Sequence, residues 1–227
     1  MRLPAPQPSA ATGVVLAGGR SRRMGESKAE LIIAGEPLLR RVTHRLQMAL
    51  SPVLVVGPPE LSLLVPGVRV LPDLHPGIGP LAGLEAALSA VTIELAFVVA
   101  CDMPCIEPKL IRGMVEFASD SPEADVVALA RQNSESGAGD RENVDSIDST
   151  EYLHAVYRSA CLPVISRQIA AERYALQQLF AELCVRVFPP KLTAQLDPHG
   201  FSTLNANTPK EWVEAQRLAG QALSQPE

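Results

Sequence analysis

The chain has 227 residues, of which 47% are hydrophobic and 20% charged, and its formal net charge is −5. This composition supports a substantial buried core, and the mild acidity argues against a general nucleic-acid-binding protein, which would carry a basic face. Four cysteines occur without any Cys-x-x-Cys pair, which favours reduced cytoplasmic thiols over zinc sites or a disulfide scaffold. Because no apolar run approaches the roughly 18 residues of a membrane span, we expect a cytoplasmic protein with no membrane segment.

Short β-rich runs alternate with helical patterns along the chain. Residues 1–11 form a proline-rich tail that lacks the apolar core of a secretion signal, and residues 12–221 are expected to form a single domain. Strands are predicted at 12–17, 53–56, 68–71, 95–100, 125–130, 152–157 and 185–188. Helices are predicted at 37–50, 80–91, 107–117, 159–180 with a break or kink at Pro163, and 209–218.

The segment 131–150 differs in composition from the rest of the chain. It contains five acidic residues, and its apolar residues are only Ala138, Val144 and Ile147. A segment this polar cannot bury enough apolar surface to offset the entropy lost on ordering. We therefore predict a mobile acidic surface loop within the domain.

The predicted strands show no internal alternation of apolar and polar residues, which indicates burial on both faces. Strands of this kind, separated by helices, predict an α/β fold with a mostly parallel sheet covered on both sides. In such a fold the loops that follow the strands lie along the carboxyl edge of the sheet. The loops after Ala17, Leu71 and Ala100 should therefore meet at this edge.

The segment from Leu16 to Lys28 contains a glycine pair, Gly18 and Gly19, directly after a predicted strand. Glycines allow a bulky anion to approach backbone amides, and the dense cations that follow suit the oxygens of a polyphosphate. These cations are Arg20, Arg22, Arg23 and Lys28. A glycine turn with solvated arginines is the alternative. The segment matches neither the Walker motif nor G-x-G-x-x-G, which argues against P-loop ATPases and nicotinamide dehydrogenases.

Two aspartates follow other predicted strands. Asp102 is well placed for Mg²⁺, which favours one or two carboxylates together with substrate phosphates, although a turn aspartate before Pro104 is an equal alternative. Asp73 begins a loop rich in glycine and proline that leads into a helix and could wall a base pocket. For Asp73, a simple connecting turn is the better interpretation of the residues alone.

The polar residues of the C-terminal half leave further alternatives open. Either Asn207 or Thr208 can cap the last helix, with Pro209 in its first turn, so capping does not explain both Asn205 and Asn207. Asn205 could bind a metal or a phosphate. His154 lies in a predicted strand, where it is either a histidine at the edge of the core or a contact for substrate.

Several of these motifs, taken in order, resemble those of the molybdenum cofactor guanylyltransferases. L-A-G-G-R-S-R-R-M-G-E-S-K resembles the family pattern L-A-G-G-x-S-x-R-M-G-x-D-K, with Ser27 in place of its aspartate. L-P-D-L-H-P-G-I-G-P-L-A-G-L is similar to an aspartate followed by P-G-x-G-P-L-x-G, and V-V-A-C-D-M-P-C-I to a strand ending in C-D-M-P. Y-L-H-A-V-Y-R and L-N-A-N-T-P-K-E resemble two further family segments, so the resemblance covers nearly the whole chain.

The resemblance implies a three-layer, Rossmann-like nucleotidyltransferase fold. It also implies a reaction in which the terminal phosphate of molybdenum-molybdopterin attacks the α-phosphate of GTP. Pyrophosphate leaves, and molybdopterin guanine dinucleotide forms. The implied metal is Mg²⁺, and the implied partners beyond the two substrates are molybdoenzymes or their chaperones.

The resemblance also implies roles for individual residues. Nucleotide contacts fall to Leu16, Ala17, Gly18, Gly19, Lys28, Asp73, Gly79, Gly83 and Asp102. Arg23, Lys28 and Asp102 are the expected catalytic residues, the first two at the phosphates and Asp102 at the Mg²⁺. The acceptor substrate is expected to meet His154, Asn205 and Asn207.

Two alternatives stay open at this point. A molybdopterin cytidylyltransferase, or another small-molecule nucleotidyltransferase, has the same architecture, but these enzymes usually show L-A-A-G where this chain has L-A-G-G. A non-catalytic molybdopterin carrier or docking protein belongs to a different class. The presence of Arg23, Lys28 and Asp102 favours an enzyme.

Overall fold

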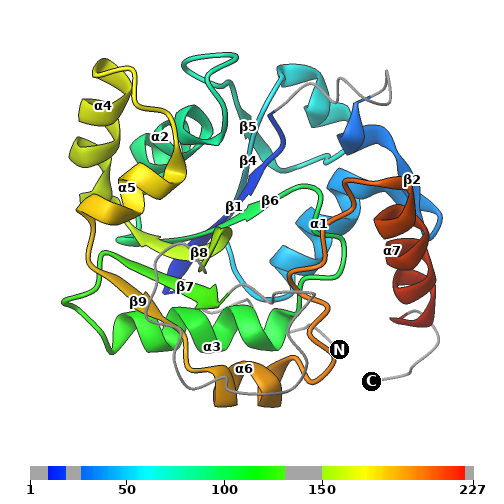
Figure 1. Cartoon of the computed structure of the whole chain (residues 1–227). Coiled ribbons are helices and arrows are strands. Elements are labelled where there is room, and N and C mark those ends of the chain that lie inside the picture. Colours follow the sequence, from blue (N-terminus) through cyan, green and yellow to red (C-terminus); the bar gives the residue numbers. More distant parts are fainter. Residues whose placement is uncertain (1–9, 19–26, 131–149, 223–227) are drawn as a thin grey trace, which may run out of the picture.

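The computed structural model describes residues 10–18, 27–130 and 150–222, which form an α/β fold built around one large sheet (Figure 1). Its strands are β1 (Ala11–Leu16), β4 (Val53–Val56), β5 (Arg69–Leu71), β6 (Leu95–Ala100), β7 (Val126–Ala130), β8 (Thr150–Arg158) and β9 (Val185–Val187). They are ordered β5-β4-β1-β6-β8-β7-β9. β8 pairs antiparallel with β6 and β7, and the other neighbours pair in parallel. The mostly parallel sheet predicted from the sequence is confirmed.

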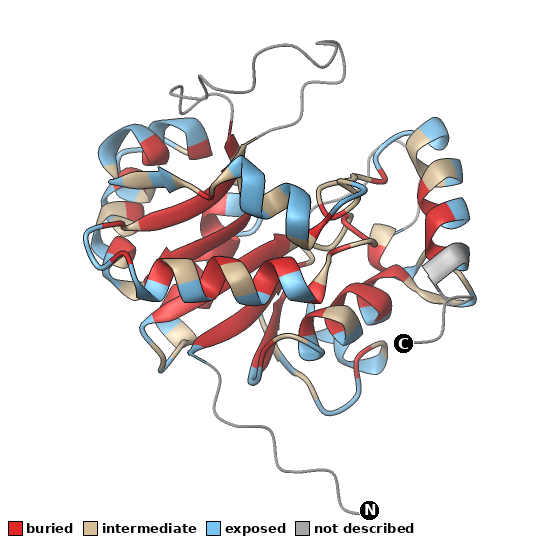
Figure 2. Ribbon diagram, turned by 90° about the horizontal axis from the view of Figure 1, so that it is seen from below, coloured by how far each residue is buried: buried red, intermediate tan, exposed pale blue. Residues whose placement is uncertain are grey.

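Helices cover both faces of the sheet and complete the three layers (Figure 1). One face carries α1 (Leu38–Gln47), α3 (Pro108–Ser119), α6 (Pro190–Leu196) and α7 (Pro209–Ala222). The other carries α2 (Pro80–Ala90), α4 (Leu162–Ala170) and α5 (Leu176–Glu182). Figure 2 shows the buried strands between these helical layers, as expected for strands without apolar–polar alternation.

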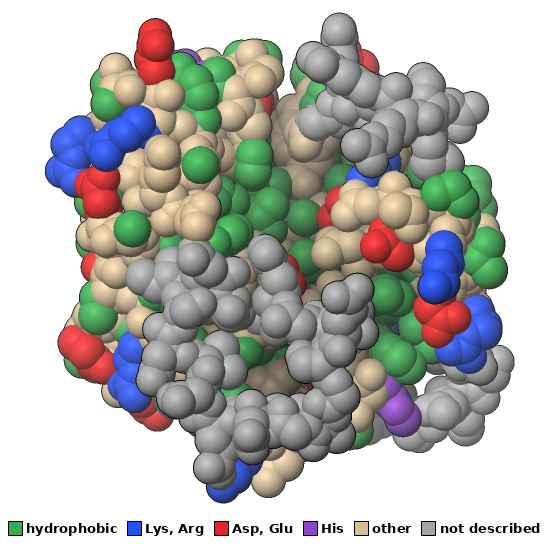
Figure 3. Space-filling view, in the orientation of Figure 1, with side chains coloured by type: hydrophobic (Ala, Val, Ile, Leu, Met, Phe, Trp, Pro, Cys, Tyr) green, Lys and Arg blue, Asp and Glu red, His purple; other side chains and the backbone are tan. Residues whose placement is uncertain are grey.

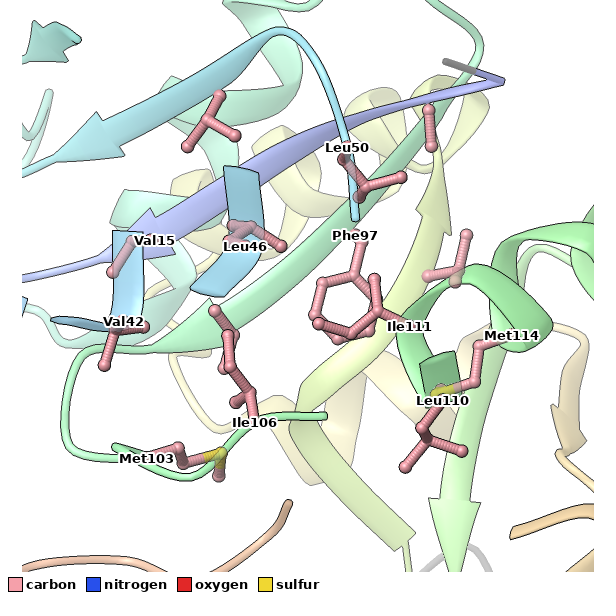
Figure 4. Packing of buried hydrophobic residues seen from close by; sticks show 14 of the residues in the cluster. Val15, Val42, Leu46, Leu50, Phe97, Met103, Ile106, Leu110, Ile111 and Met114 are labelled. Carbon is pink, nitrogen blue, oxygen red and sulfur yellow. The ribbon is translucent and has the colours of Figure 1, made fainter. Parts of the chain in front are cut away.

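Successive residues of each strand point into two separate hydrophobic cores. Phe97 and Val99 lie in the core beneath α1 and α3, whereas Val98 lies in the core beneath α2 and α4. In the first core Phe97 lies beside Ile111 of α3, with Leu46 of α1 nearby (Figure 4). Because both cores are filled, the strands are fixed and the loops at their ends start from defined positions.

Several short elements were not predicted from the sequence. They are η1 (Lys28–Glu30), β2 (Ile32–Ile33), β3 (Glu36–Pro37), η2 (Pro59–Leu63) and η4 (Ser159–Cys161), in addition to α6. The hairpin of β2 and β3 turns at Ala34 and Gly35, which have φ angles of 49° and 84°. Each strand of this hairpin is only two residues long. A segment this short shows too little hydrophobic periodicity to be recognised from the sequence.

The predicted break of a long helix at Pro163 was wrong. Pro163 lies in the first turn of α4, where a missing backbone donor has no cost. The helix instead ends at Ala170, and Glu172 reverses the chain with a φ of 55° before α5 begins. The other predicted elements are present, with ends that agree or are shifted by up to four residues.

Two predicted segments fall largely outside the described residues. Of the expected tail 1–11, Ala11 is the first residue of β1, and of the expected acidic loop 131–150, Thr150 is the first residue of β8. Within the described residues, no helix combines the length and the hydrophobicity needed to cross a membrane.

Candidate active site at the carboxyl edge of the sheet

The carboxyl ends of four parallel strands are joined in a continuous row. Ala17 donates its amide to the carbonyl of Val56 (2.8 Å), and Cys101 donates to the carbonyl of Leu16 (3.0 Å). Gly57 donates to the carbonyl of Leu71 (2.9 Å). The loops that follow β1, β4, β5 and β6 therefore begin side by side, as the parallel arrangement predicts.

A lysine, an aspartate and an asparagine from distant parts of the chain meet at this edge. The Lys28 ammonium lies 3.2 Å from Oδ2 of Asp102 and also donates a short hydrogen bond to Oδ1 of Asn207. The Lys28 and Asp102 side chains are 22% and 19% exposed, so solvent and ligands can reach the pair. The face of the molecule in Figure 3 is hollowed near its middle, where hydrophobic side chains form much of the surface.

The backbone holds Asn207 in this position. Glu211 accepts hydrogen bonds from the amides of Asn207 and Thr208 at 2.9 Å each, and the Thr208 hydroxyl accepts from the Glu211 amide at 3.2 Å. This reciprocal pattern is a capping box at the start of α7, with Thr208 as the cap and Pro209 in the first turn. The Ala206 amide also donates to the carbonyl of Asp102 at 2.9 Å. Capping thus explains Thr208 and leaves the Asn207 side chain available for the site.

Asp102 has an unused oxygen that fits a metal ion. Its Oδ1 atom is buried and has no hydrogen-bond partner among the described residues. A buried, unpartnered carboxylate oxygen requires an explanation, and a role in binding a cation is one of the ordinary explanations. No group of three or more His, Cys, Asp or Glu side chains in the described ranges could cage a metal by itself. One carboxylate completed by substrate phosphates is the arrangement that Mg²⁺ commonly uses.

Two arginines of α1, the buried Arg41 and the partly exposed Arg45, hold the segment that carries Asp102. Nε of Arg41 donates to the carbonyl of Pro104 at 3.1 Å, and Nη2 donates to the carbonyl of Ala219 in α7 at 3.3 Å. One turn further along α1, Nε of Arg45 donates to the carbonyl of Ile106 at 2.6 Å. Burial, and next the positive charge of Arg45, lowers the pKa of Arg41 from its ordinary value. This role could not be predicted from the sequence, because the sequence does not distinguish an arginine that is buried on a helix from one that is solvated.

The loop after β5 places its aspartate beside Gly18. A Cβ atom built on Gly18 would lie 3.8 Å from Oδ2 of Asp73, so this carboxylate faces the end of β1. Oδ1 of Asp73 accepts a hydrogen bond from the amide of His75 at 2.9 Å, which makes a tight turn. Gly79 begins α2 with a φ of 98°, a conformation that other residues rarely adopt. This shaped loop is open to solvent and suits the wall of a base pocket.

Other predicted nucleotide residues have different surroundings. Gly83 is buried in α2, where an added Cβ would lie 3.3 Å from the side chain of Leu16, which is itself 7% exposed. Gly83 therefore serves close packing of the helix on the strand, and only the backbone of Leu16 is at the edge. Ala17 is half-buried and Gly18 exposed, whereas Gly19 and Arg23 lie outside the described residues.

His154 lies in the core, so the expectation of a direct contact with the acceptor is corrected. The side chain has no accessible surface, its ring meets Phe97 edge-on, and its Nε2 atom lies 2.8 Å from the hydroxyl of Ser202. Burial lowers the pKa of His154 from 6.5 to about 4, which keeps the ring neutral. Ser202 also accepts from the amide of Glu107 at 2.9 Å. His154 thus braces the segment that leads to Asn205, which is half-buried, and Asn207.

A second hollow, of about 400 Å³, lies at the opposite edge of the sheet. Its lining includes Thr12 at the start of β1, Pro52 before β4, and Thr92 before β6. A strand of six residues separates the two edges by roughly 20 Å. The carboxyl edge, where charged groups converge, is therefore the candidate active site.

Comparison with known proteins shows the family of this chain. A family model described as a MobA-like NTP transferase domain matches residues 13–205. The chain is also 35% identical over 209 residues to a probable molybdenum cofactor guanylyltransferase of Pelotomaculum thermopropionicum, covering 92% of this chain and 93% of that relative. The chain belongs to the molybdenum cofactor guanylyltransferase family. It is therefore a nucleotidyltransferase, as its motifs predicted.

Other proteins match over most of this chain. A molybdenum cofactor guanylyltransferase of Desulfosudis oleivorans is 29% identical over 208 residues, covering 91% of this chain and 95% of that protein. The crystal structure of the molybdopterin-guanine dinucleotide biosynthesis protein A of Archaeoglobus fulgidus has a TM-score of 0.73, with 23% identity. The match covers 92% of this chain and 99% of that one, which confirms the predicted fold.

Proposed function

We propose that this chain transfers GMP from GTP to the terminal phosphate of molybdenum-molybdopterin. Pyrophosphate is released, and molybdopterin guanine dinucleotide is formed. Family membership supports this activity, as does the order of the motifs along the chain. The observation that carries the proposal is the meeting of Lys28, Asp102 and Asn207 at the carboxyl edge of the sheet, where β1 and β6 end side by side.

The chemistry requires alignment and charge neutralisation more than proton transfer. An ionised phosphate oxygen of the acceptor attacks the α-phosphorus, a new P–O bond forms, and the bond to the pyrophosphate oxygen breaks. No general base is needed, because the nucleophile is already deprotonated. The side chains agree: burial raises the pKa of the Cys101 thiol to about 12, and His154 is neutral and inaccessible.

The residues divide this work between the two substrates. Lys28, together with Arg23, neutralises the phosphates of GTP. The Asp73 carboxylate and the loop to Gly79 bind the guanosine, and Asp102 and Asn207 offer oxygen ligands for Mg²⁺. This metal, when bound to the phosphates, supplies electrostatic stabilisation of the negative charge that develops in the transition state. Asn205 and Asn207 would contact the acceptor substrate.

The nucleotide and the acceptor can be tested in one assay. We expect pyrophosphate release with GTP, Mg²⁺ and molybdenum-loaded molybdopterin, and little release with CTP or ATP. GTP with Mg²⁺ should also raise the melting temperature more than CTP or ATP does, because a ligand that binds the folded state more tightly stabilises it more. Equal turnover with CTP would instead favour a cytidylyltransferase, and pterin binding without turnover would favour a carrier protein.

We also propose a cytoplasmic setting in which the product passes to a molybdoenzyme or its chaperone. All four cysteines are free thiols, which agrees with a reducing compartment. Gel filtration of the product-loaded enzyme with a cofactor-free molybdoenzyme tests this transfer. We expect cofactor to move into the molybdoenzyme fraction, and its retention on the enzyme would contradict the proposal.

A further inference from the structure

The Lys28 ammonium stands between the two oxygen groups that would bind the metal. It lies 3.2 Å from Oδ2 of Asp102 and hydrogen bonds to Oδ1 of Asn207. Carboxylate and amide oxygens are also the ligands that Mg²⁺ uses in proteins. The same two side chains cannot satisfy the lysine fully while they bind a divalent cation.

We propose that Lys28 is a placeholder cation that keeps the metal ligands occupied until a nucleotide arrives. The phosphates of the incoming nucleotide draw the ammonium away from Asp102 and Asn207, and only then are Oδ2 of Asp102 and Oδ1 of Asn207 free for Mg²⁺. Metal binding is thereby made dependent on nucleotide binding. This inference rests on the proposed function, because it takes Asp102 as the metal ligand and Lys28 as a phosphate ligand.

The surroundings of Asp102 distinguish a placeholder from a permanent ion pair. Its Oδ2 atom faces Lys28, but its buried Oδ1 atom has no partner among the residues that the structure describes. A structural carboxylate is normally satisfied at both oxygens when it is buried. One oxygen of Asp102 thus has no partner among these residues, while the other is paired with Lys28.

The lysine itself is able to leave. Its side chain is 22% exposed, and its long flexible stem allows the ammonium to take several positions. While the ammonium stays, its charge repels a second cation at the same oxygens. With one carboxylate and no cage of acidic side chains in the described ranges, the protein alone binds Mg²⁺ weakly.

Binding of Mn²⁺ to the full chain without nucleotide tests the proposal, with free Mn²⁺ measured by electron paramagnetic resonance. Wild type should bind weakly. Lys28→Met should bind about tenfold tighter, within the usual range of coupling between two sites, and Lys28→Arg should stay weak because it keeps the cation. Lys191→Met, which removes an exposed lysine in α6, is the matched control for net charge and should behave as wild type.

The double variant Lys28→Met, Asp102→Asn should lose the gain in Mn²⁺ affinity, and thermal unfolding should show that each variant is folded. Equal affinity in Lys28→Met and wild type would overturn the placeholder role. A gain that survives in the double variant would overturn it too, because the ion would then be bound elsewhere. If wild type transfers no nucleotide from any triphosphate in the pyrophosphate assay, the proposed function fails, whatever Mn²⁺ does.

Discussion

Lys28 and Arg158 are cations at opposite edges of the sheet, and their partners differ in kind. At the carboxyl edge, Lys28 is paired with one carboxylate and one amide oxygen and stays partly exposed. At the amino edge, Arg158 is buried and donates to the carbonyls of Ala118, Ser121 and Ala124. It also pairs with the mostly exposed Glu94.

The two edges therefore use positive charge for different purposes. Backbone carbonyls cannot move away without unfolding the loop that carries them, so Arg158 acts as a clamp on the end of α3. Side-chain oxygens can exchange one cation for another, as we propose for the site that contains Lys28. β8 accounts for the separation, because its antiparallel direction puts Arg158 opposite Leu95, at the start of β6.

The largest effect is expected at the carboxyl edge. Asp102→Asn should lower turnover by about 10²- to 10³-fold, because it removes the negative charge that would bind the Mg²⁺. The melting temperature should change little, since the substitution is nearly isosteric. Pyrophosphate release and thermal unfolding measure the two quantities. Asp120→Asn, an exposed aspartate after α3, is the matched control, and turnover of Asp102→Asn within threefold of this control would remove Asp102 from the mechanism.

The opposite edge should respond in stability instead. Arg158→Met leaves the carbonyl of Ala124 without its side-chain donor and removes one donor each from the carbonyls of Ala118 and Ser121, which should lower the free energy of unfolding by about 3 kcal/mol. Chemical denaturation measures this loss, and the KM for GTP of the folded fraction should stay near wild type. Arg217→Met removes an exposed arginine paired with Glu214 and should have little effect on either quantity. If Arg158→Met and Arg217→Met unfold at the same denaturant concentration, Arg158 does not stabilise the end of α3.

The pH dependence of stability tests the burial of His154, which lies in the core near the carboxyl edge. Because burial lowers its pKa from 6.5 to about 4, the unfolded chain binds a proton in this interval that the folded chain does not bind. Its contribution to stability is complete above pH 6.5 and is lost as the pH falls toward 4. Between pH 7 and pH 5, wild type should lose about 2 kcal/mol more than His154→Gln does. Parallel stability curves for the two proteins would show that His154 is not buried in its neutral form.

The carboxyl edge could be predicted because its signals are local. Asp102 directly follows a continuous apolar strand, and parallel strands bring such residues to one edge. Lys28 and Asn207 were each predicted at the site, but their contact was not, since they are 179 residues apart in the chain. That contact depends on the capping box at α7 and on the hydrogen bond between Ala206 and Asp102, which only the folded chain brings together.

The amino edge was missed for a physical reason. The partners of Arg158 are backbone carbonyls, which every residue carries, so no pattern of side chains marks their position. His154 illustrates the same difficulty, because one histidine in a strand reads equally as a core residue or a ligand. Its burial follows from Phe97 and Ser202, which pack against it from other segments.

Arg41 is buried like Arg158, but it supports the candidate active site. Arg41→Lys keeps the charge and loses the planar fork that joins the carbonyls of Pro104 and Ala219. We expect the free energy of unfolding to fall by about 1 kcal/mol, and kcat to fall about threefold because the Asp102 segment loses one support. Arg40→Lys changes the adjacent, exposed arginine and should leave both values unchanged. If Arg41→Lys lowers stability without changing kcat, Arg41 has the same structural role as Arg158. Burial of the cation, and not the edge at which it lies, would then decide whether it serves stability or the site.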